Sequence, residues 1–476
     1  PGWLTEFTSR GTGSETATSF NAEVTPQTGV SQSVHTTALR ATAEKGSKAV
    51  PYNLSNSTGA ADVENTANCY VVNAPGTYSF PLVYGNAINN GQVNYAAYTS
   101  KASIQGTLNP FINHLGNGIT DPYIAKNTDC VPVKAELVWQ DAPSLVTDIK
   151  YNSGTNGGTI SFKVDKENIR QGNALIAIKD SQNTILWSWH IWITDENIYH
   201  TIKVTNHQNV SHDLMPIHLG WCEGEVINYA ARSCQVQFIA HGQTRLITVN
   251  QMRSTTSTQG NCTFYEWGRK DPLRPSSGYA YKNKTWYNAA GIASTANHAV
   301  ESFPFGNECI KNYIRKPDVM QKEIGGDNTY FNLWNADNNT NSNVYNDNPV
   351  TKTVYDPCPV GFAMPPSNTF TGFTTTGENV TNTVAKYNGE WNSSLPGWNF
   401  YCGPNKTGGT IFFPMTGERI SSGGHLSAVG SLGHTWSATS THSNYAHNLT
   451  LYTNYWVWPL DRFSKSAGHG VRPCLE

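Results

Sequence analysis

Short stretches of β-branched and aromatic residues, separated by turn residues, dominate residues 61–200 of this 476-residue chain. Each stretch has the length of a β-strand, and the Gly, Pro, Asn and Asp residues between the stretches are typical of tight turns. The longest apolar run of the chain, over 185–193, is itself only of strand length. We therefore expect a mainly β fold, with strands over 69–72, 77–84, 135–139, 159–164, 174–178 and 185–193.

Several short strands at this spacing predict an immunoglobulin-like β-sandwich over 61–200. Residues 1–60 are rich in Ser, Thr, Gly and Ala, so we expect an N-terminal arm or the end of a preceding β domain, with one strand over 19–24. A polar stretch near 195–212 marks the predicted boundary, and 201–476 is expected to form a second domain.

Charge argues against nucleic acid as a partner, and hydropathy argues against a membrane-spanning segment. Charged residues make up 14% of the chain, against a typical value of about 25%, and the net charge is −2 without any Lys/Arg run. Nucleic acid is therefore not an expected partner. No run of about 18 apolar residues is present, so no transmembrane segment is predicted. The chain begins at Pro1-Gly2-Trp3, which we interpret as a processed end of an exported protein.

Five segments of the second half occur in a fixed order and carry a family resemblance. They resemble the major paralogous domain first noted in Fibrobacter and common in Bacteroidetes surface proteins, a family related to the C-type-lectin-like fold. The segments cover 213–220, 264–272, 355–365, 434–439 and 470–474. The resemblance implies an α+β C-type-lectin-like domain over 201–476, with Trp267, Trp436 and 471–473 in its scaffold. The prolines near 357–366 predict a short helix near 367–373.

A second resemblance concerns the first half. Segments 66–72 and 187–192 look like a module that precedes such domains in fimbrillin-type or lipoprotein adhesins. Together the resemblances imply an extracellular, cell-surface adhesin, either outer-membrane-associated or fimbrial. Its expected partner is a host or bacterial glycan or protein receptor. At a pilus tip, strand exchange with a pilin subunit would also be expected.

Binding residues are expected between 440 and 466, where aromatic and amide side chains alternate. Aromatic faces contact sugar rings or apolar side chains, and amides supply directional hydrogen bonds. The predicted ligand-binding residues are Tyr445, Asn448, Tyr452, Asn454, Tyr455, Trp456 and Trp458. The same alternation is typical of an ordinary strand with one buried face. The region also matches the position that retroelement-diversified lectin-like proteins vary.

No cofactor is predicted, and the metal candidates in the sequence are weak. Asp337, Asn339, Asn341 and Asn343 offer alternating oxygens for calcium, but the glycine and glutamate of an EF-hand loop are absent. A solvated Asn-rich loop is the simpler interpretation. His434, His442 and His447 lie close in sequence without a metal-ligand spacing, and we expect them in a surface loop.

Nine cysteines are scattered along the chain with no CxxC pair, which disfavours zinc. Export would allow disulfides, and the odd number of cysteines leaves at least one unpaired. The sequence does not determine the pairing, and our candidate pairs are Cys69–Cys130 and Cys358–Cys474.

Catalysis is not expected, because the chain has neither a GxSxG motif nor a phosphate-binding P-loop. The enzyme alternative is a relative of formylglycine-generating oxidases, which share the broad fold and need a copper-binding cysteine pair. Cys402 and Cys474, near the end of the chain, are the candidates for this pair.

Two further alternatives to an adhesin are a diversified receptor-binding display protein, borne by phage or varied by a retroelement, and a structural fibre subunit without small-ligand binding.

Overall fold

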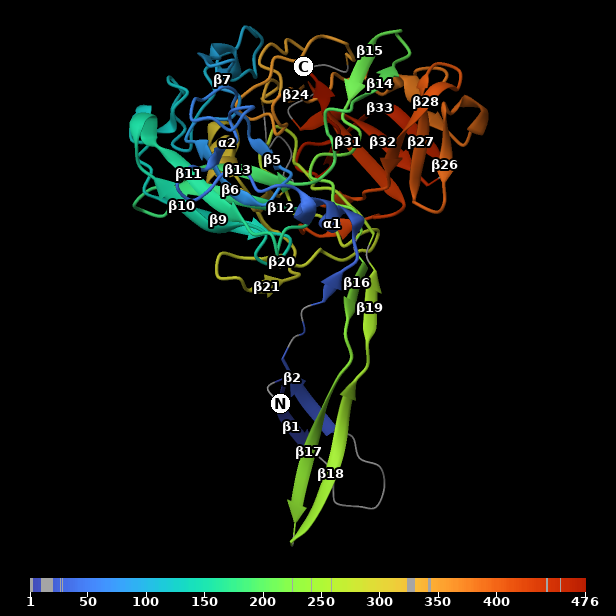
Figure 1. The fold of residues 1–476 in the computed structure, drawn as a ribbon. Coiled ribbons are helices and arrows are strands. Elements are labelled where there is room, and N and C mark those ends of the chain that lie inside the picture. The colour runs from blue at the N-terminus through green and yellow to red at the C-terminus, as the bar shows by residue number, and fades with distance from the viewer. Residues whose placement is uncertain are drawn as a thin grey trace.

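The computed structural model describes residues 3–9, 20–25, 27, 29–224, 226–240, 242–257, 259–322, 330–340, 344–441, 444–453 and 455–476. The chain is mainly β, with 40% strand and 7% helix, which confirms the predicted class. Figure 1 shows a broad β-rich body from which one long hairpin projects, with the N-terminal strands beside it.

Two sheets face each other in the first half of the body. The six-stranded sheet has the order β21 (Ala293–Ser294), β20 (Trp286–Tyr287), β9 (Lys134–Gln140), β12 (Gly172–Lys179), β13 (Ile185–Ile193) and β5 (Cys69–Val72). The four-stranded sheet has the order β10 (Thr147–Asn152), β11 (Thr159–Val164), β6 (Gly76–Pro81) and β4 (Tyr52–Asn53). Aromatic rings fill the space between them, and the Phe80 and Trp189 centroids lie 5.0 Å apart. This is the packing expected of a two-sheet core.

Three further sheets form the second half. One has the order β25 (Val380–Thr381), β33 (Trp456–Ser464), β32 (Tyr445–Tyr452), β31 (Leu432–Ser440) and β34 (Gly470–Val471). The second joins β26 (Gly389–Asn392), β27 (Gly397–Gly403) and β28 (Thr407–Pro414). The third joins β14 (Ile202–Thr205), β15 (Ser211–Leu214), β35 (Cys474–Leu475) and β24 (Phe362–Ala363).

Short two-stranded pairs complete the body. They are β7 (Ile88–Asn89) with β8 (Gln92–Val93), β22 (Ala299–Glu301) with β23 (Val319–Gln321), and β29 (Glu418–Arg419) with β30 (Leu426–Ser427). The 3-10 turns are η1 (Tyr95–Ala97), η2 (Ile124–Lys126), η3 (Thr155–Gly157), η4 (Thr371–Phe373) and η5 (Val384–Lys386).

The largest apolar core crosses the predicted boundary near residue 200. Its buried members run from Leu39 through Trp189 to Trp436 and Val471. Tyr287 also pairs with Gln140, which adds β20 from the second half to the six-stranded sheet. The three-part division of the chain stays a prediction, and the two halves share one core.

Two α-helices were not expected from the sequence. Helix α1 (Val34–Ala41) begins after Ser33, whose side chain accepts a hydrogen bond from the Thr36 backbone amide. This helix lies within residues 1–60, for which the sequence predicted an N-terminal extension or the end of a preceding β domain. Helix α2 (Asn307–Arg315) buries Ile310 and Ile314 against the body. Over the predicted helix 367–373 the structure has only the 3-10 turn η4.

A long hairpin, which we call the arm, leaves the body between 226 and 257 (Figure 1). At its base β16 (Val226–Tyr229) pairs with β19 (Ser254–Ser257) and with β3 (Val30–Ser31). Beyond the base, β17 (Arg232–Ala240) pairs with β18 (Gln243–Gln251), and the separate pair β1 (Leu4–Ser9) and β2 (Phe20–Val24) lies beside them. The Arg232 guanidinium lies 4.6 Å from the Trp3 ring and donates to the Thr25 carbonyl.

The predicted disulfides are not formed, and all nine cysteines are free thiols. Cys69 on β5 lies close enough to Cys358, before β24, to interact with it electrostatically, whereas Cys130 follows η2 and Cys474 lies on β35. Cys130 instead accepts a hydrogen bond from the Asn113 amide at 3.5 Å. The pairing was wrong because order along the chain does not determine which cysteines meet.

Candidate functional site

Four of the predicted binding residues form one continuous group, which we call the aromatic ladder: Tyr452, Tyr455, Trp456 and Trp458. Antiparallel pairing places Tyr452 of β32 directly opposite Trp456 of β33. Trp456 and Trp458 are two residues apart on one strand, so they lie on the same face. Val457 between them is fully buried in the core of the other face. The strand alternation therefore presents the ladder to one side of the sheet.

The rings of the ladder are stacked along the sheet. The Trp456 and Trp458 centroids are 4.6 Å apart with an angle of 7° between the ring planes. Tyr452 follows at 4.9 Å from Trp456, and Tyr455 lies 6.1 Å from Tyr452. Tyr455 is 53% exposed, and the other three rings are partly exposed. The ladder is thus a solvent-facing surface rather than part of the hydrophobic interior.

Strand β25 fixes the outer side of the ladder. The Trp458 indole donates to Thr381 Oγ1 at 2.9 Å. The backbone amide of Asn382 donates to the Tyr455 backbone carbonyl at 2.8 Å, and the Tyr387 hydroxyl donates to the same oxygen. The first contact holds the Trp458 ring and the other two hold the backbone at Tyr455 before any ligand arrives, which lowers the entropy lost on binding.

The other predicted binding residues do not join this group. Tyr445 is 40% exposed but begins β32, seven residues or about 23 Å from Tyr452 at strand spacing. Asn448 is only 1% exposed, because the sheet face is covered at this point, and its side-chain amide donates to Thr450 Oγ1 at 2.9 Å. Asn454 lies outside the described residues.

The histidines expected in a surface loop are instead buried in strands. His434 on β31 is 2% exposed and His447 on β32 is 1% exposed. The expectation was wrong because His434 and His447 lie on strands that are covered on both faces, so a side chain is buried whichever way it points. His442 lies outside the described residues.

The calcium candidate segment serves as a support for a neighbouring loop. Asp337 Oδ1 accepts from the Lys101 amide at 3.2 Å and its Oδ2 accepts from Thr351 Oγ1 at 2.8 Å. The Asn339 side chain accepts from the Ser103 amide. Asn341 and Asn343 lie outside the described residues. The described oxygens therefore already have donors.

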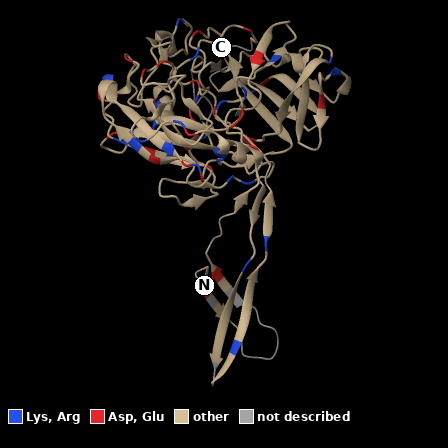
Figure 2. Cartoon of the chain, in the orientation of Figure 1, with Lys and Arg blue, Asp and Glu red and all other residues tan. Residues whose placement is uncertain are grey.

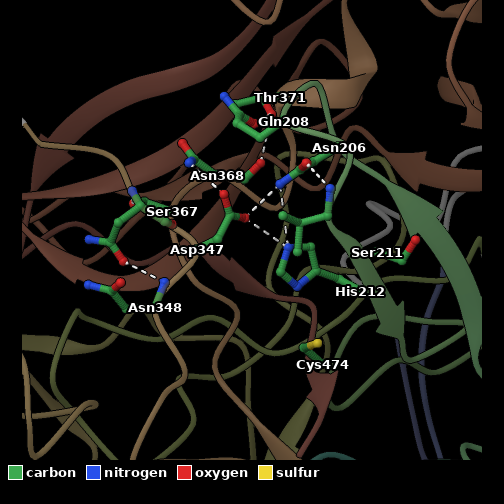
Figure 3. A network of polar contacts seen from close by, with 12 residues as sticks. Asn206, Gln208, Ser211, His212, Asp347, Asn348, Ser367, Asn368, Thr371 and Cys474 are labelled. Carbon is green, nitrogen blue, oxygen red and sulfur yellow. Dashed lines mark hydrogen bonds and ion pairs between the residues drawn. The ribbon is translucent and has the colours of Figure 1, made fainter.

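A second polar cluster joins the β14–β15 hairpin to the body (Figure 3). Asp347 is its centre. Its Oδ1 accepts a hydrogen bond from the Asn206 side-chain amide at 2.6 Å and lies 3.1 Å from His212 Nε2. Its Oδ2 accepts a hydrogen bond from the Asn368 side-chain amide at 2.8 Å. Beside it, Thr371 donates to Gln208. Every carboxylate oxygen has a partner, so this cluster is structural.

Sequence reasoning missed the cavities lined by the described residues, among them two of contrasting polarity. The larger, about 510 Å³, lies at the base of the arm and is lined by polar and charged residues that include Asp141, Arg170, Glu223 and Lys284. The second, about 330 Å³, is mainly apolar and is lined by Trp221, Leu395, Phe412 and Pro414 among others. Both combine segments far apart along the chain, so no local motif marks them.

No protein-family model, curated protein or solved structure matches the chain. Within the described ranges, none of the helices is long and apolar enough to cross a membrane.

Proposed function

We propose that this protein is an extracellular, cell-surface adhesin that binds carbohydrate through the aromatic ladder. The observation that carries the proposal is the row of stacked, partly exposed rings on a rigid sheet. Large exposed apolar groups on a single-chain protein commonly mark an interaction site. Tyr and Trp give a large contact area with few rotatable bonds, so little entropy is lost when they are covered.

A glycan suits the ladder better than a charged partner does. Between Tyr445 and Leu460 the sequence has no Lys, Arg, Asp or Glu, and Figure 2 shows scattered charges of both signs over the body. Because Trp456 and Trp458 stack on each other, a sugar unit would contact their exposed edges and the ring faces at the ends of the row. The exposed Tyr455 side chain carries a hydroxyl that can form hydrogen bonds with sugar hydroxyl groups.

Catalysis through the late cysteines has little support in the geometry. Cys474 is buried and Cys402 is partly buried, and burial raises the pKa of both thiols. The thiol form, which is the weaker nucleophile and metal ligand, is therefore favoured at neutral pH.

The test is a glycan array followed by titration of any glycan that is bound. Replacing Trp456 and Trp458 by alanine should weaken binding about tenfold or more, since aromatic anchors carry much of the energy of an interface. The matched control is Tyr95→Ala, because Tyr95 is a 63% exposed aromatic outside the ladder. Unchanged affinity in the tryptophan variant, or equal weakening in the control, would refute the ladder as the binding site.

A structural fibre subunit is the second candidate, favoured by the arm. Ile239, Leu246 and Met252 are 70%, 61% and 76% exposed there. Since unpaired strand edges and exposed apolar residues promote pairing with another strand, the occupant we expect is a second copy of this chain.

A variant in which residues 232–251 are replaced by a short turn tests this candidate. The wild type should form end-to-end polymers in electron micrographs, and the shortened variant should stay monomeric with a melting temperature close to that of the wild type. Polymers without the arm, or a monomeric wild type at high concentration, would contradict the candidate.

A further inference from the structure

The outer end of the arm carries two exposed apolar residues on one face. Ile239 and Leu246 are 70% and 61% exposed. Ile239 pairs with Thr244 and Leu246 pairs with Gln237, so the two apolar side chains are diagonal neighbours on the same side of the hairpin. We call them the tip pair. Figure 1 shows that this end of the arm is the part of the molecule farthest from the body.

An apolar hollow lies at the opposite end of the arm. It is the cavity of about 330 Å³ described above, and we call it the root pocket. Residues 223–224, shortly before β16, and residues 259–260, shortly after β19, contribute to its wall. Its apolar lining includes Ile217, Trp221, Leu395, Phe412 and Pro414. Since a cavity of about 150 Å³ holds a benzene ring, the root pocket has room for about two branched side chains.

The accessible charge at the root pocket is negative. Glu223 is exposed, and its Oε1 accepts a hydrogen bond from the Trp221 indole at 2.6 Å, which holds the carboxylate beside the pocket. Arg472 also lines the pocket, but it is only 1% exposed and donates to the backbone carbonyls of Met215 and Phe412. An incoming group therefore meets an apolar surface with a carboxylate next to it.

The arm has the complementary charge. Residues 226–257 contain three arginines and neither Asp nor Glu. One of these arginines, Arg245, is exposed and directly precedes Leu246 of the tip pair. A contact between the tip pair and the root pocket would thus bring a cation toward Glu223, and opposite charges at the edge of a contact favour the correct orientation.

The arm does not reach its own root pocket. Strand β17 alone separates the two ends by nine residues, or about 30 Å at strand spacing. Folding back would break the hydrogen bonds that join β17 to β18 and β16 to β19. The occupant of the pocket must therefore come from another molecule, and a second copy of this chain supplies a group of matching polarity, size and charge.

We propose that the tip pair of one copy inserts into the root pocket of a second copy. Removal of Ile239 and Leu246 from water would supply most of the favourable free energy. The tip and the pocket are different surfaces, so a copy that inserts its own arm can also receive one, and the contact can continue along a chain of copies. This inference rests on the premise of the second candidate function, that the arm contacts another copy, and it is independent of glycan binding.

Sedimentation velocity of the full-length chain over a range of concentrations tests the contact. The wild type should self-associate. Leu246→Glu in the tip and Leu395→Glu in the pocket should each raise the dissociation constant at least about tenfold, because each places a charge in an apolar contact. Leu395 is 52% exposed, and the melting temperature of both variants should stay close to that of the wild type. The matched control is Val384→Glu, since Val384 is 64% exposed and lies outside the arm and the pocket.

A mixture of the two variants makes the test sharper. Leu246→Glu keeps an intact pocket and Leu395→Glu keeps an intact tip pair, so one complete contact can form between them. The mixture should give one-to-one pairs and no longer assemblies, at concentrations where each variant alone is monomeric. A mixture that stays monomeric would overturn the proposed contact.

The remaining outcomes separate this inference from the fibre candidate. A wild type that is monomeric at all concentrations overturns both. Polymers that persist in Leu246→Glu and in Leu395→Glu, or equal weakening in the Val384→Glu control, overturn the insertion of the tip pair and leave the fibre candidate standing. A closed dimer that both arm and pocket variants disrupt supports the insertion and contradicts the fibre candidate.

Discussion

Lys270 and Asp271 form an ion pair in the centre of the body, with side chains 2% and 1% exposed and an Nζ–Oδ1 distance of 2.7 Å. Lys270 also donates to the Ser188 carbonyl and hydroxyl on β13, and lies 4.5 Å from the Trp187 ring. Burial lowers the pKa of Lys270 to about 8, and Asp271 opposes that shift. The pair is satisfied only because two segments 82 residues apart along the chain meet there.

Replacing Lys270 by alanine should lower the free energy of unfolding by about 3–5 kcal/mol, because Asp271 is left as a buried unpaired charge. Urea denaturation at pH 7 measures the change. Lys134→Ala is the control, since Lys134 is 58% exposed and pairs with Glu136 at 3.0 Å, and it should lose less than about 1 kcal/mol. Similar losses in both variants would contradict this account of the pair.

Single residues differed in how well the sequence predicted them. Trp267 and Trp436 were expected in the scaffold and are fully buried. The burial of Lys270 and Asp271 could not be predicted, because charged residues are usually exposed and the partner Ser188 lies far away in sequence. In the candidate site, alternation predicted the outward rings of Trp456 and Trp458. It failed at Asn448, since alternation gives the face of a side chain but not whether other residues cover that face, as they do at Asn448 and Thr450.

Hairpin β14–β15 depends on a carboxylate outside it. Asp347 lies in a loop more than 130 residues away and accepts from the Asn206 and Asn368 amides (Figure 3). The side chains of Asp347 and His212 are 19% and 9% exposed, so water replaces these contacts poorly.

Asp347→Ala should therefore destabilise the protein by about 1–3 kcal/mol, because several partly buried donors lose their acceptor. Hydrogen exchange should accelerate selectively over 202–214. Asp62→Ala is the control at an exposed aspartate, and it should leave exchange over 202–214 unchanged. Unaltered exchange in the Asp347 variant would show that the hairpin is held by its apolar contacts alone.

At the scale of elements, strong strand patterns were predicted best. The strands over 159–164 and 185–193 were located to the residue, because dense β-branched and aromatic residues leave no competing interpretation. The first half of helix α1, residues 34–37, consists of weak helix formers, and burial of Leu39 in the core stabilises the helix. Helix α2 carried a usable signal that was missed, since Cys309, Ile310, Tyr313 and Ile314 recur at helical spacing.

Across the whole molecule, buried histidines set the response to acid. Burial is the main cause that lowers the pKa of His114 to about 4 and of His190 to about 3, from an ordinary 6.5. His190 links the two halves, since Nε2 contacts Asn173 at 2.9 Å and Nδ1 contacts the Tyr265 hydroxyl at 3.2 Å. Between pH 6.5 and 4 the unfolded chain binds these protons and the folded chain does not.

Stability should therefore fall as the pH drops below 6.5, by up to about 1.4 kcal/mol per pH unit for each such histidine. Urea midpoints at pH 7.5, 5.5 and 4.5 measure the effect. His190→Asn should flatten the slope in this window, since it removes one of the titrating groups. A midpoint that is constant or rises on acidification would contradict the expectation.

The arm also determines how the molecule would respond to mechanical load. Strands β17 and β18 extend it by about 30 Å at nine residues each. The chain enters and leaves the body through the paired strands β16 and β19, with β3 alongside β16. A pull on the tip is thus carried into the body by β16 and β19. The hydrogen bonds between β3 and β16 lie across the direction of this pull. They are therefore loaded in shear and must rupture together.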